Sequence, residues 1–172
     1  PDGSYEFLQP RLAEWLKVDQ KAVRALLNRM AFDAHRDQPD LQGTADIAQK
    51  KLVDELLALN TNPDVRPKRL EEYLGLRTGL LEPRGVGVYA FPHRTFQEYL
   101  AACHLTDHGF PDELADLLRA DPNRWREVVL LAGAKAVRGT ASAAWILAEA
   151  LCYKDLSPRP PSLFGEGQGE GS

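Results

Sequence analysis

The chain has 172 residues, a formal net charge of −4 and a pI near 5.6, so its overall charge does not favour binding to nucleic acid or anionic lipid. This length allows one domain or two small ones. No apolar run is long enough to cross a membrane, and the first residues do not resemble a signal peptide. The two cysteines, Cys103 and Cys152, lie in apolar helical patterns, which predicts reduced, buried thiols in a cytoplasmic protein. Because the chain starts at Pro1 without a methionine, we expect a fragment of a longer protein.

The first part of the chain predicts four helices separated by polar turns. They are expected over residues 4–17, 20–35, 45–59 and 67–74, the first of them either kinked at Pro10 or starting near it. Asp19 is a good N-cap for the second helix. Thr44 is expected to cap the third, with Asp46 near its positive end. Pro67 suits the first position of the fourth.

A small β-hairpin is predicted after these helices. Gly79 ends the helical pattern, Leu80 and Leu81 form a brief strand, and residues 88–91 return as its partner after a glycine-rich turn. Helices followed by a short hairpin describe a winged-helix module. Its parts are too small to fold separately, so the helices and the wing are expected to share one core.

The segment FPHRTFQEYLAA after the hairpin combines a strand end with a helix start. Pro92 cannot donate to a strand ladder, and Thr95 with Glu98 matches a capping box, so a helix is expected to open at Phe96. Loss of Glu98 is then expected to cost about 1 kcal/mol. His93 is left just outside this helix start, where free amides and the helix dipole favour an anion such as phosphate.

The remaining pattern predicts paired helices with short turns. Asp112 and Asn123 are expected to open two of them, and Thr140 or Ser142 the last. Short connections imply antiparallel α-hairpins, as at the start of a solenoid. We therefore predict a mainly α chain with three parts: a winged-helix subdomain over residues 1–108, a helical arm over 109–155, and a disordered, proline- and glycine-rich tail over 156–172.

The hairpin and the helix after it resemble the end of the winged-helix subdomain in NACHT-type NTPases of the STAND class, especially bacterial ones. The family pattern there is Arg-x-Gly-Leu-Leu, a variable wing tip, and Phe-x-His-x-(Ser/Thr)-Phe-Gln-Glu-(Tyr/Phe)-x-Ala-Ala. The matching residues here are Arg77, Gly79, Leu80, Leu81, Phe91, His93, Thr95, Phe96, Gln97, Glu98, Tyr99, Ala101 and Ala102. Upstream ADIAQKKLVDELL and downstream WREVVLLAGA are also similar, so the resemblance covers roughly residues 5–152.

This resemblance implies a regulatory module. In such proteins a histidine of the winged helix contacts the β-phosphate of ADP and holds the protein closed. Exchange for ATP releases the arm and allows oligomerisation. By motif position that histidine is His93. The implied partners are an intramolecular nucleotide-binding domain and, in the active state, further copies of the parent protein, with signal transduction and bacterial defence as the implied setting.

One element of the family is absent from the sequence. No GxxxxGK[ST] motif occurs, so the phosphate-cradling loop and its magnesium-binding hydroxyl are not in this chain. We therefore expect a non-enzymatic chain that binds no cofactor by itself. ADP or ATP with magnesium would be bound by the parent protein.

The sequence leaves two other functions open for the winged helix. Stand-alone DNA binding is the first, because six cations fall on the fourth helix, the wing and the helix start: Arg66, Lys68, Arg69, Arg77, Arg84 and Arg94. Against it, the short recognition helix carries Glu71 and Glu72 and has no clear set of side chains to read bases. A helical protein-interaction scaffold is the second. Both remain alternatives.

A metal site was weighed at His104 and His108, which are spaced i, i+4 with Cys103 beside them. Cys103 is expected on the apolar face of the helix, about 100° from His104. A cation at His108 suits the helix end. No metal ligand is therefore predicted.

Overall fold

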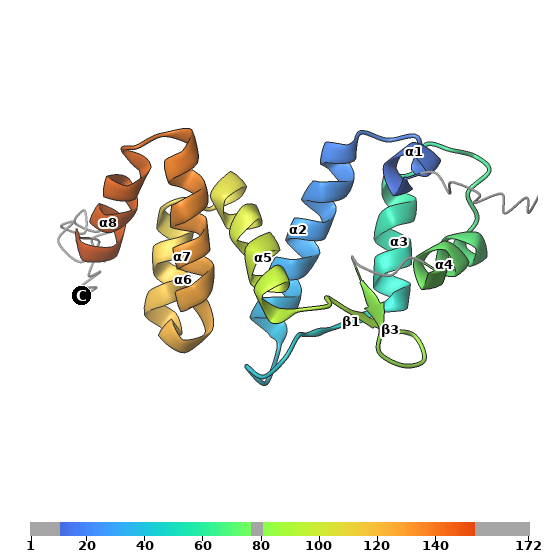
Figure 1. Cartoon of the computed structure of the whole chain (residues 1–172), viewed down its shortest axis with the longest axis horizontal. Coiled ribbons are helices and arrows are strands. Elements are labelled where there is room, and N and C mark those ends of the chain that lie inside the picture. The colour runs from blue at the N-terminus through green and yellow to red at the C-terminus, as the bar shows by residue number, and fades with distance from the viewer. Residues whose placement is uncertain (1–10, 77–80, 154–172) are drawn as a thin grey trace, which may run out of the picture.

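The computed structural model describes residues 11–76 and 81–153 and is mainly α, as predicted (Figure 1). Its elements are α1 (Leu12–Leu16), α2 (Gln20–Asp37), β1 (Asp46–Ala48), α3 (Gln49–Leu59), α4 (Pro67–Leu76), β2 (Glu82–Pro83), β3 (Val88–Ala90), α5 (Arg94–His108), α6 (Asp112–Ala120), α7 (Pro122–Gly139) and α8 (Ala143–Tyr153). The tail predicted to be disordered, residues 156–172, lies outside the described residues, as do Gly79 and Leu80.

Local sequence rules place several element ends correctly. Asp19 is the N-cap of α2, and its Oδ1 accepts a hydrogen bond of 2.8 Å from the amide of Lys21. Pro67 is the first residue of α4. The predicted hairpin is present, although β2 begins at Glu82, after Leu81, and β3 ends at Ala90.

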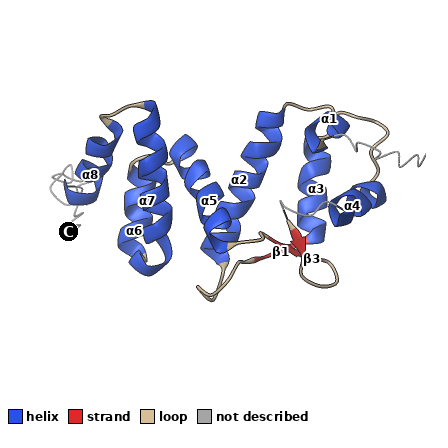
Figure 2. Ribbon diagram, viewed as in Figure 1, coloured by secondary structure: helices blue, strands red, loops and turns tan. Residues whose placement is uncertain are grey.

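The predicted start of the third helix at Thr44 is wrong. Residues 46–48 instead form β1, which pairs antiparallel with β3 (Figure 2). Since β2 pairs with the other side of β3, the three strands have the order β1-β3-β2. Ile47 lies opposite Tyr89 in this pairing, and both side chains are buried. The long-range pairing outweighs the local capping pattern, so α3 begins only at Gln49.

The helices and the sheet of the first part share one apolar core, as predicted. It contains buried side chains from α1 to α5 and from the sheet region, among them Leu16, Leu52, Leu70, Tyr89 and Leu100. A sheet of such short strands needs an apolar face packed on other elements to be stable. α5 lies beside α2 along this core (Figure 1).

A second apolar cluster joins α5 to the helices after it. Ala101, Ala102 and Leu105 of α5 pack with Trp125 and Val128 of α7, and α6 and α8 cover the same cluster. The elements α6, α7 and α8 follow one another with short turns at the end of the molecule (Figure 1). α5 therefore contributes to both clusters and connects the two halves mechanically.

The arm helices begin close to the predicted positions with different caps. Asp112 is the first residue of α6 and forms no side-chain cap, because Pro111 is the N-cap. Asp121, not Asn123, caps α7, and its Oδ1 accepts from the amide of Arg124 at 3.1 Å. Pro122 then takes the first helical position, where its missing N–H costs nothing. α8 begins just after Ser142.

In the described part of the chain, no helix combines the length and the apolar character needed to span a membrane.

Candidate functional site

His93 lies at the start of α5 and is its N-cap, with extended backbone angles of φ −138° and ψ 144°. Its side chain is exposed, and its carbonyl oxygen accepts from the amides of Phe96 at 3.0 Å and Gln97 at 3.1 Å. No side chain caps the helix. The first-turn amides thus have no side-chain acceptor, at the positive end of a fifteen-residue helix. The start of such a helix in general favours an approaching anion.

The predicted capping box at this helix start is wrong. Thr95 is already inside α5, one position after Arg94, and it is exposed. Glu98 is buried, and its Oε1 accepts from Nε of Arg94 at 2.7 Å. The extended residues before Arg94 set the helix start, and the carboxylate finds a charged partner one turn earlier instead of the cap amide.

Glu98 should therefore matter as a partner of Arg94. Replacing Arg94 with methionine leaves a carboxylate that is largely buried and unpaired, and we expect it to lower the free energy of unfolding by roughly 1–3 kcal/mol. Adding Glu98→Gln should recover part of that loss. Urea unfolding of both single variants and the double variant measures this coupling. If the stability losses of the two single variants simply add in the double variant, Arg94 and Glu98 do not stabilise each other.

Gln97, the neighbour of Glu98, is the centre of a buried hydrogen-bond network. Its side chain is 0 % exposed. Its Oε1 accepts from the amide of Ala45 at 2.8 Å, just before β1. Its Nε2 donates to Oε1 of Gln38 at 3.2 Å and to Nδ1 of His35 at 3.3 Å, both at the end of α2. One side chain thus joins α5, the end of α2 and the approach to β1.

Arg124 of α7 extends this network from the other half of the molecule. One of its terminal nitrogens, Nη1, donates to the carbonyl oxygens of His35 at 2.7 Å and Gln38 at 2.8 Å. These carbonyls belong to the last turn of α2, where intrahelical donors are missing. Nε of Arg124 pairs with Oδ2 of Asp121 at 3.2 Å. We call the set His35, Gln38, Gln97 and Arg124 the polar lock.

His35 is neutral in this arrangement. Its Nε2 lies 3.0 Å from the carbonyl oxygen of Arg124, which can only accept, so Nε2 carries the proton. Nδ1 then accepts from Gln97. Burial lowers the pKa of His35, while the hydrogen bond to the carbonyl of Arg124 and the charge of Glu98 partly raise it. Protonation of Nδ1 would set two donors against each other and open the polar lock.

Stability should consequently decrease in mild acid. Burial also lowers the pKa of His104, with the charge of His108 acting in the same direction. Because both folded-state pKa values lie below the ordinary value near 6.5, the unfolded chain binds more protons as pH decreases below about 6.5. Within this range, the free energy of unfolding should be highest at pH 7.5 and should decrease towards pH 5.5. Each histidine should contribute at most about 1.4 kcal/mol per pH unit to this decrease.

Urea unfolding across this pH range tests the assignment. His104→Gln should remove the part of the pH dependence that comes from His104 and leave the part that comes from His35. The double variant with His35→Gln should show a nearly flat profile between pH 7.5 and 5.5. An unchanged slope in the double variant would mean that other groups cause the effect.

The cations proposed for DNA binding are partly engaged within the chain. Arg84, on the wing, donates to the carbonyl oxygen of Thr44 at 2.9 Å and to its hydroxyl at 2.8 Å, and pairs with Asp46 at 3.3 Å. Arg94 is paired with Glu98. Arg77 lies outside the described residues. Arg84 thus fastens the wing to β1, and the geometry gives DNA readout no added support.

The two histidines spaced i, i+4 on α5 contact other rings, although Nδ1 of His104 is buried with no hydrogen-bond partner among the described residues. The rings of His104 and His108 stack at 4.7 Å, and His104 also contacts Phe32 at 4.9 Å between ring centroids. Nδ1 of His108 lies 3.1 Å from the carbonyl oxygen of His104. Among the described residues, no cluster of histidine, cysteine and acidic side chains suits a metal ion. Cys103 is buried as predicted, but the prediction of a buried Cys152 is wrong, since this residue is exposed on α8, the last described helix.

Sequence reasoning placed His93 but missed the polar lock. The motif contains Gln97, yet nothing local shows that its partners are His35 and Gln38, 62 and 59 positions away. A buried glutamine on an apolar helical face is the one available hint, since such a group needs partners. Arg124 lies 89 positions from His35, and nothing in the sequence around it indicates that the two residues are hydrogen-bond partners.

Comparison with known proteins identified one family. The model of a winged helix-turn-helix domain C-terminal to NACHT matches residues 9–105, more than half of the chain. The match extends from the residues just before α1 nearly to the end of α5, and so includes His93 and Gln97. No curated protein and no solved structure matched the chain.

Proposed function

Because this chain belongs to the family of winged helix-turn-helix domains C-terminal to NACHT, we propose that it is the regulatory part of a NACHT protein. In this proposal the chain docks on the nucleotide-binding domain of the same protein and responds to ADP or ATP there. The single observation that supports it best is His93, an exposed N-cap at the uncapped start of a long helix. The phosphate loop and magnesium belong to the nucleotide-binding domain, since this sequence has no GxxxxGK[ST] motif.

The chemistry proposed for His93 is anion recognition. An imidazole N–H directed at a terminal phosphate oxygen forms a charge-assisted hydrogen bond, and the helix start adds a favourable field. One such contact is too weak to hold a nucleotide without the phosphate loop. It can, however, make a docked state more stable with ADP than with ATP, which is what a switch requires.

The polar lock supports a route from His93 to the helical arm. Gln97 lies one helical turn after His93, and its partners belong to α2 and, through them, to Arg124 of α7. Movement of the start of α5 therefore carries α2 and α7 with it. We propose that loss of the ADP contact releases α2, α5 and α7 as one body and exposes surfaces for assembly into a homo-oligomer that transmits a signal.

Hydrogen exchange in the intact NACHT protein tests docking directly. With Mg-ADP bound, amides of residues 94–97 should exchange several-fold more slowly than with a non-hydrolysable ATP analogue, because the start of α5 is covered only in the closed state. Amides of α6 serve as the internal control and should not respond. Equal exchange of residues 94–97 in both nucleotide states would contradict docking at this surface.

A further inference from the structure

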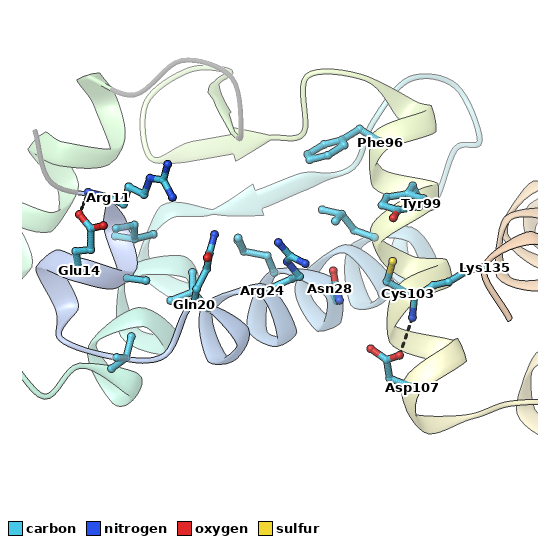
Figure 3. A pocket seen from close by; sticks show the side chains of 16 residues that line it. Arg11, Glu14, Gln20, Arg24, Asn28, Phe96, Tyr99, Cys103, Asp107 and Lys135 are labelled. Carbon is cyan, nitrogen blue, oxygen red and sulfur yellow. Dashed lines mark hydrogen bonds and ion pairs between the residues drawn. The ribbon is translucent and has the colours of Figure 1, made fainter. Parts of the chain in front are cut away.

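A cavity of about 790 Å³ lies on the side of α2 and α5 that faces α1 (Figure 3). Its apolar wall comes from Leu12 of α1, Val23 and Leu27 of α2, and Phe96 and Leu100 of α5. This volume falls in the range of small-molecule sites, which is about 300–1,000 Å³. Such a wall would bury an aliphatic chain of moderate length.

Asn28 of α2 supplies an unused polar group in this cavity. Its side chain lines the cavity, the residue is only 4 % exposed, and its Oδ1 is buried with no hydrogen-bond partner among the described residues. Figure 3 shows it between Arg24 and Cys103. A buried carbonyl without a donor costs roughly 1–3 kcal/mol. Because this oxygen is itself buried, the Asn28 side chain has to rotate towards the cavity before the N–H group of a ligand can bind it and remove this cost.

Two exposed arginines at the cavity edge define the charge of such a ligand. Arg11 and Arg24 line the cavity (Figure 3), and within the described residues neither forms an ion pair with an acidic side chain. Lys135, also on the edge, is by contrast paired with Asp107 at 2.6 Å. Guanidinium groups bind carboxylates through two parallel hydrogen bonds.

We propose that this cavity binds a small amphipathic acid of the N-acyl amino acid class. The acyl chain would pack on Val23, Leu27 and Leu100. The amide N–H would donate to Oδ1 of Asn28, and the carboxylate would accept from Arg24 and Arg11. Within the described residues, the donor requirement comes from the unpaired oxygen of Asn28 and the anionic end from arginines without an ion pair, while the apolar requirement comes from the core side chains that form the cavity wall. This inference does not depend on the proposed role of His93.

N-octanoylglycine is a suitable probe, with its ethyl ester and decanoic acid as controls that lack the charge and the amide respectively. Titration calorimetry on the full chain should show the acid binding about tenfold more tightly than either control. Arg24→Gln should weaken the acid about tenfold and leave the ester unchanged. Arg126→Gln, which removes an exposed charge from α7, is the matched control and should have no effect. The Asn28→Ala variant should bind N-octanoylglycine and decanoic acid with equal affinity.

Cys103 gives a second readout, because its side chain lines the same cavity and is 7 % exposed. In a Cys152→Ser background, saturating N-octanoylglycine should slow alkylation of Cys103 several-fold. Absence of both heat and protection would overturn the proposal, and so would equal binding of the acid and its ester. Protection of Cys103 in the intact NACHT protein, without any effect of the probe on the isolated chain, would show that a protein surface covers the cavity and would also overturn it.

Discussion

Replacing His93 with alanine is expected to accelerate ADP release from the intact NACHT protein by about tenfold to a hundredfold. The expectation follows from the loss of one hydrogen bond to a charged group, worth roughly 1.5–3 kcal/mol in a partly covered site. ADP would stabilise the closed state less, so basal assembly or signalling should rise in parallel. Release of a fluorescent ADP after mixing with excess unlabelled ADP measures the rate.

Two variants separate the contact from a general effect on the helix. Thr95→Ala is the matched control, because Thr95 is exposed in the same first turn and makes no cap. It should release ADP at the parental rate. His93→Gln keeps a donor and should fall between the parent and His93→Ala. Parental release from His93→Ala would remove His93 from the switch while leaving the fold description intact.

Replacing Gln97 with alanine is expected to lower the free energy of unfolding by about 2–4 kcal/mol, the largest stability effect predicted for a polar residue here. The change leaves the amide of Ala45, Nδ1 of His35 and Oε1 of Gln38 without their partner in a fully buried region. Unfolding in urea, followed by circular dichroism, provides the measurement. Gln97→Met tests the hydrogen bonds separately from packing, because methionine nearly fills the volume without offering donors or acceptors.

Methionine should therefore recover only a minor part of the loss. Gln20→Ala, at an exposed position in the first turn of α2, is the comparison and should change stability by less than about 0.5 kcal/mol. A loss below about 1 kcal/mol for both Gln97 variants would show that the polar lock does not hold the two halves together. The proposed route from His93 to the arm would then lack its mechanical basis.

The features predicted correctly from the sequence depend on short-range physics. Asp19 caps α2 and Pro67 opens α4 because each satisfies a need of the helix end within one turn. Pro92 is expected to end the strand pairing, and His93 just after it is the N-cap of α5, although the helix begins at Arg94 and not at Phe96. The hairpin followed from its glycine-rich turn between two β-prone runs.

The features that were missed depend on partners far along the chain. β1 is only three residues long and exists because it pairs with β3, 40 to 44 positions later. Thr95 and Glu98 match a capping pattern that the backbone does not use, because Arg94 is a better partner for a buried carboxylate. The hydrogen bonds of Gln97 form only when α2, α5 and the loop before β1 are packed together. No short stretch of sequence includes all the partners, so a local pattern cannot predict them.

The proposed contact between His93 and the nucleotide can be tested without any substitution. An ADP analogue with a photoreactive azidoanilide on its β-phosphate, bound to the intact NACHT protein with magnesium, should attach to the peptide containing residues 91–98 on illumination. Excess ADP should prevent the attachment, and an ATP analogue should not support it. Attachment confined to the nucleotide-binding domain, with none at residues 91–98, would contradict the proposed role of this helix start.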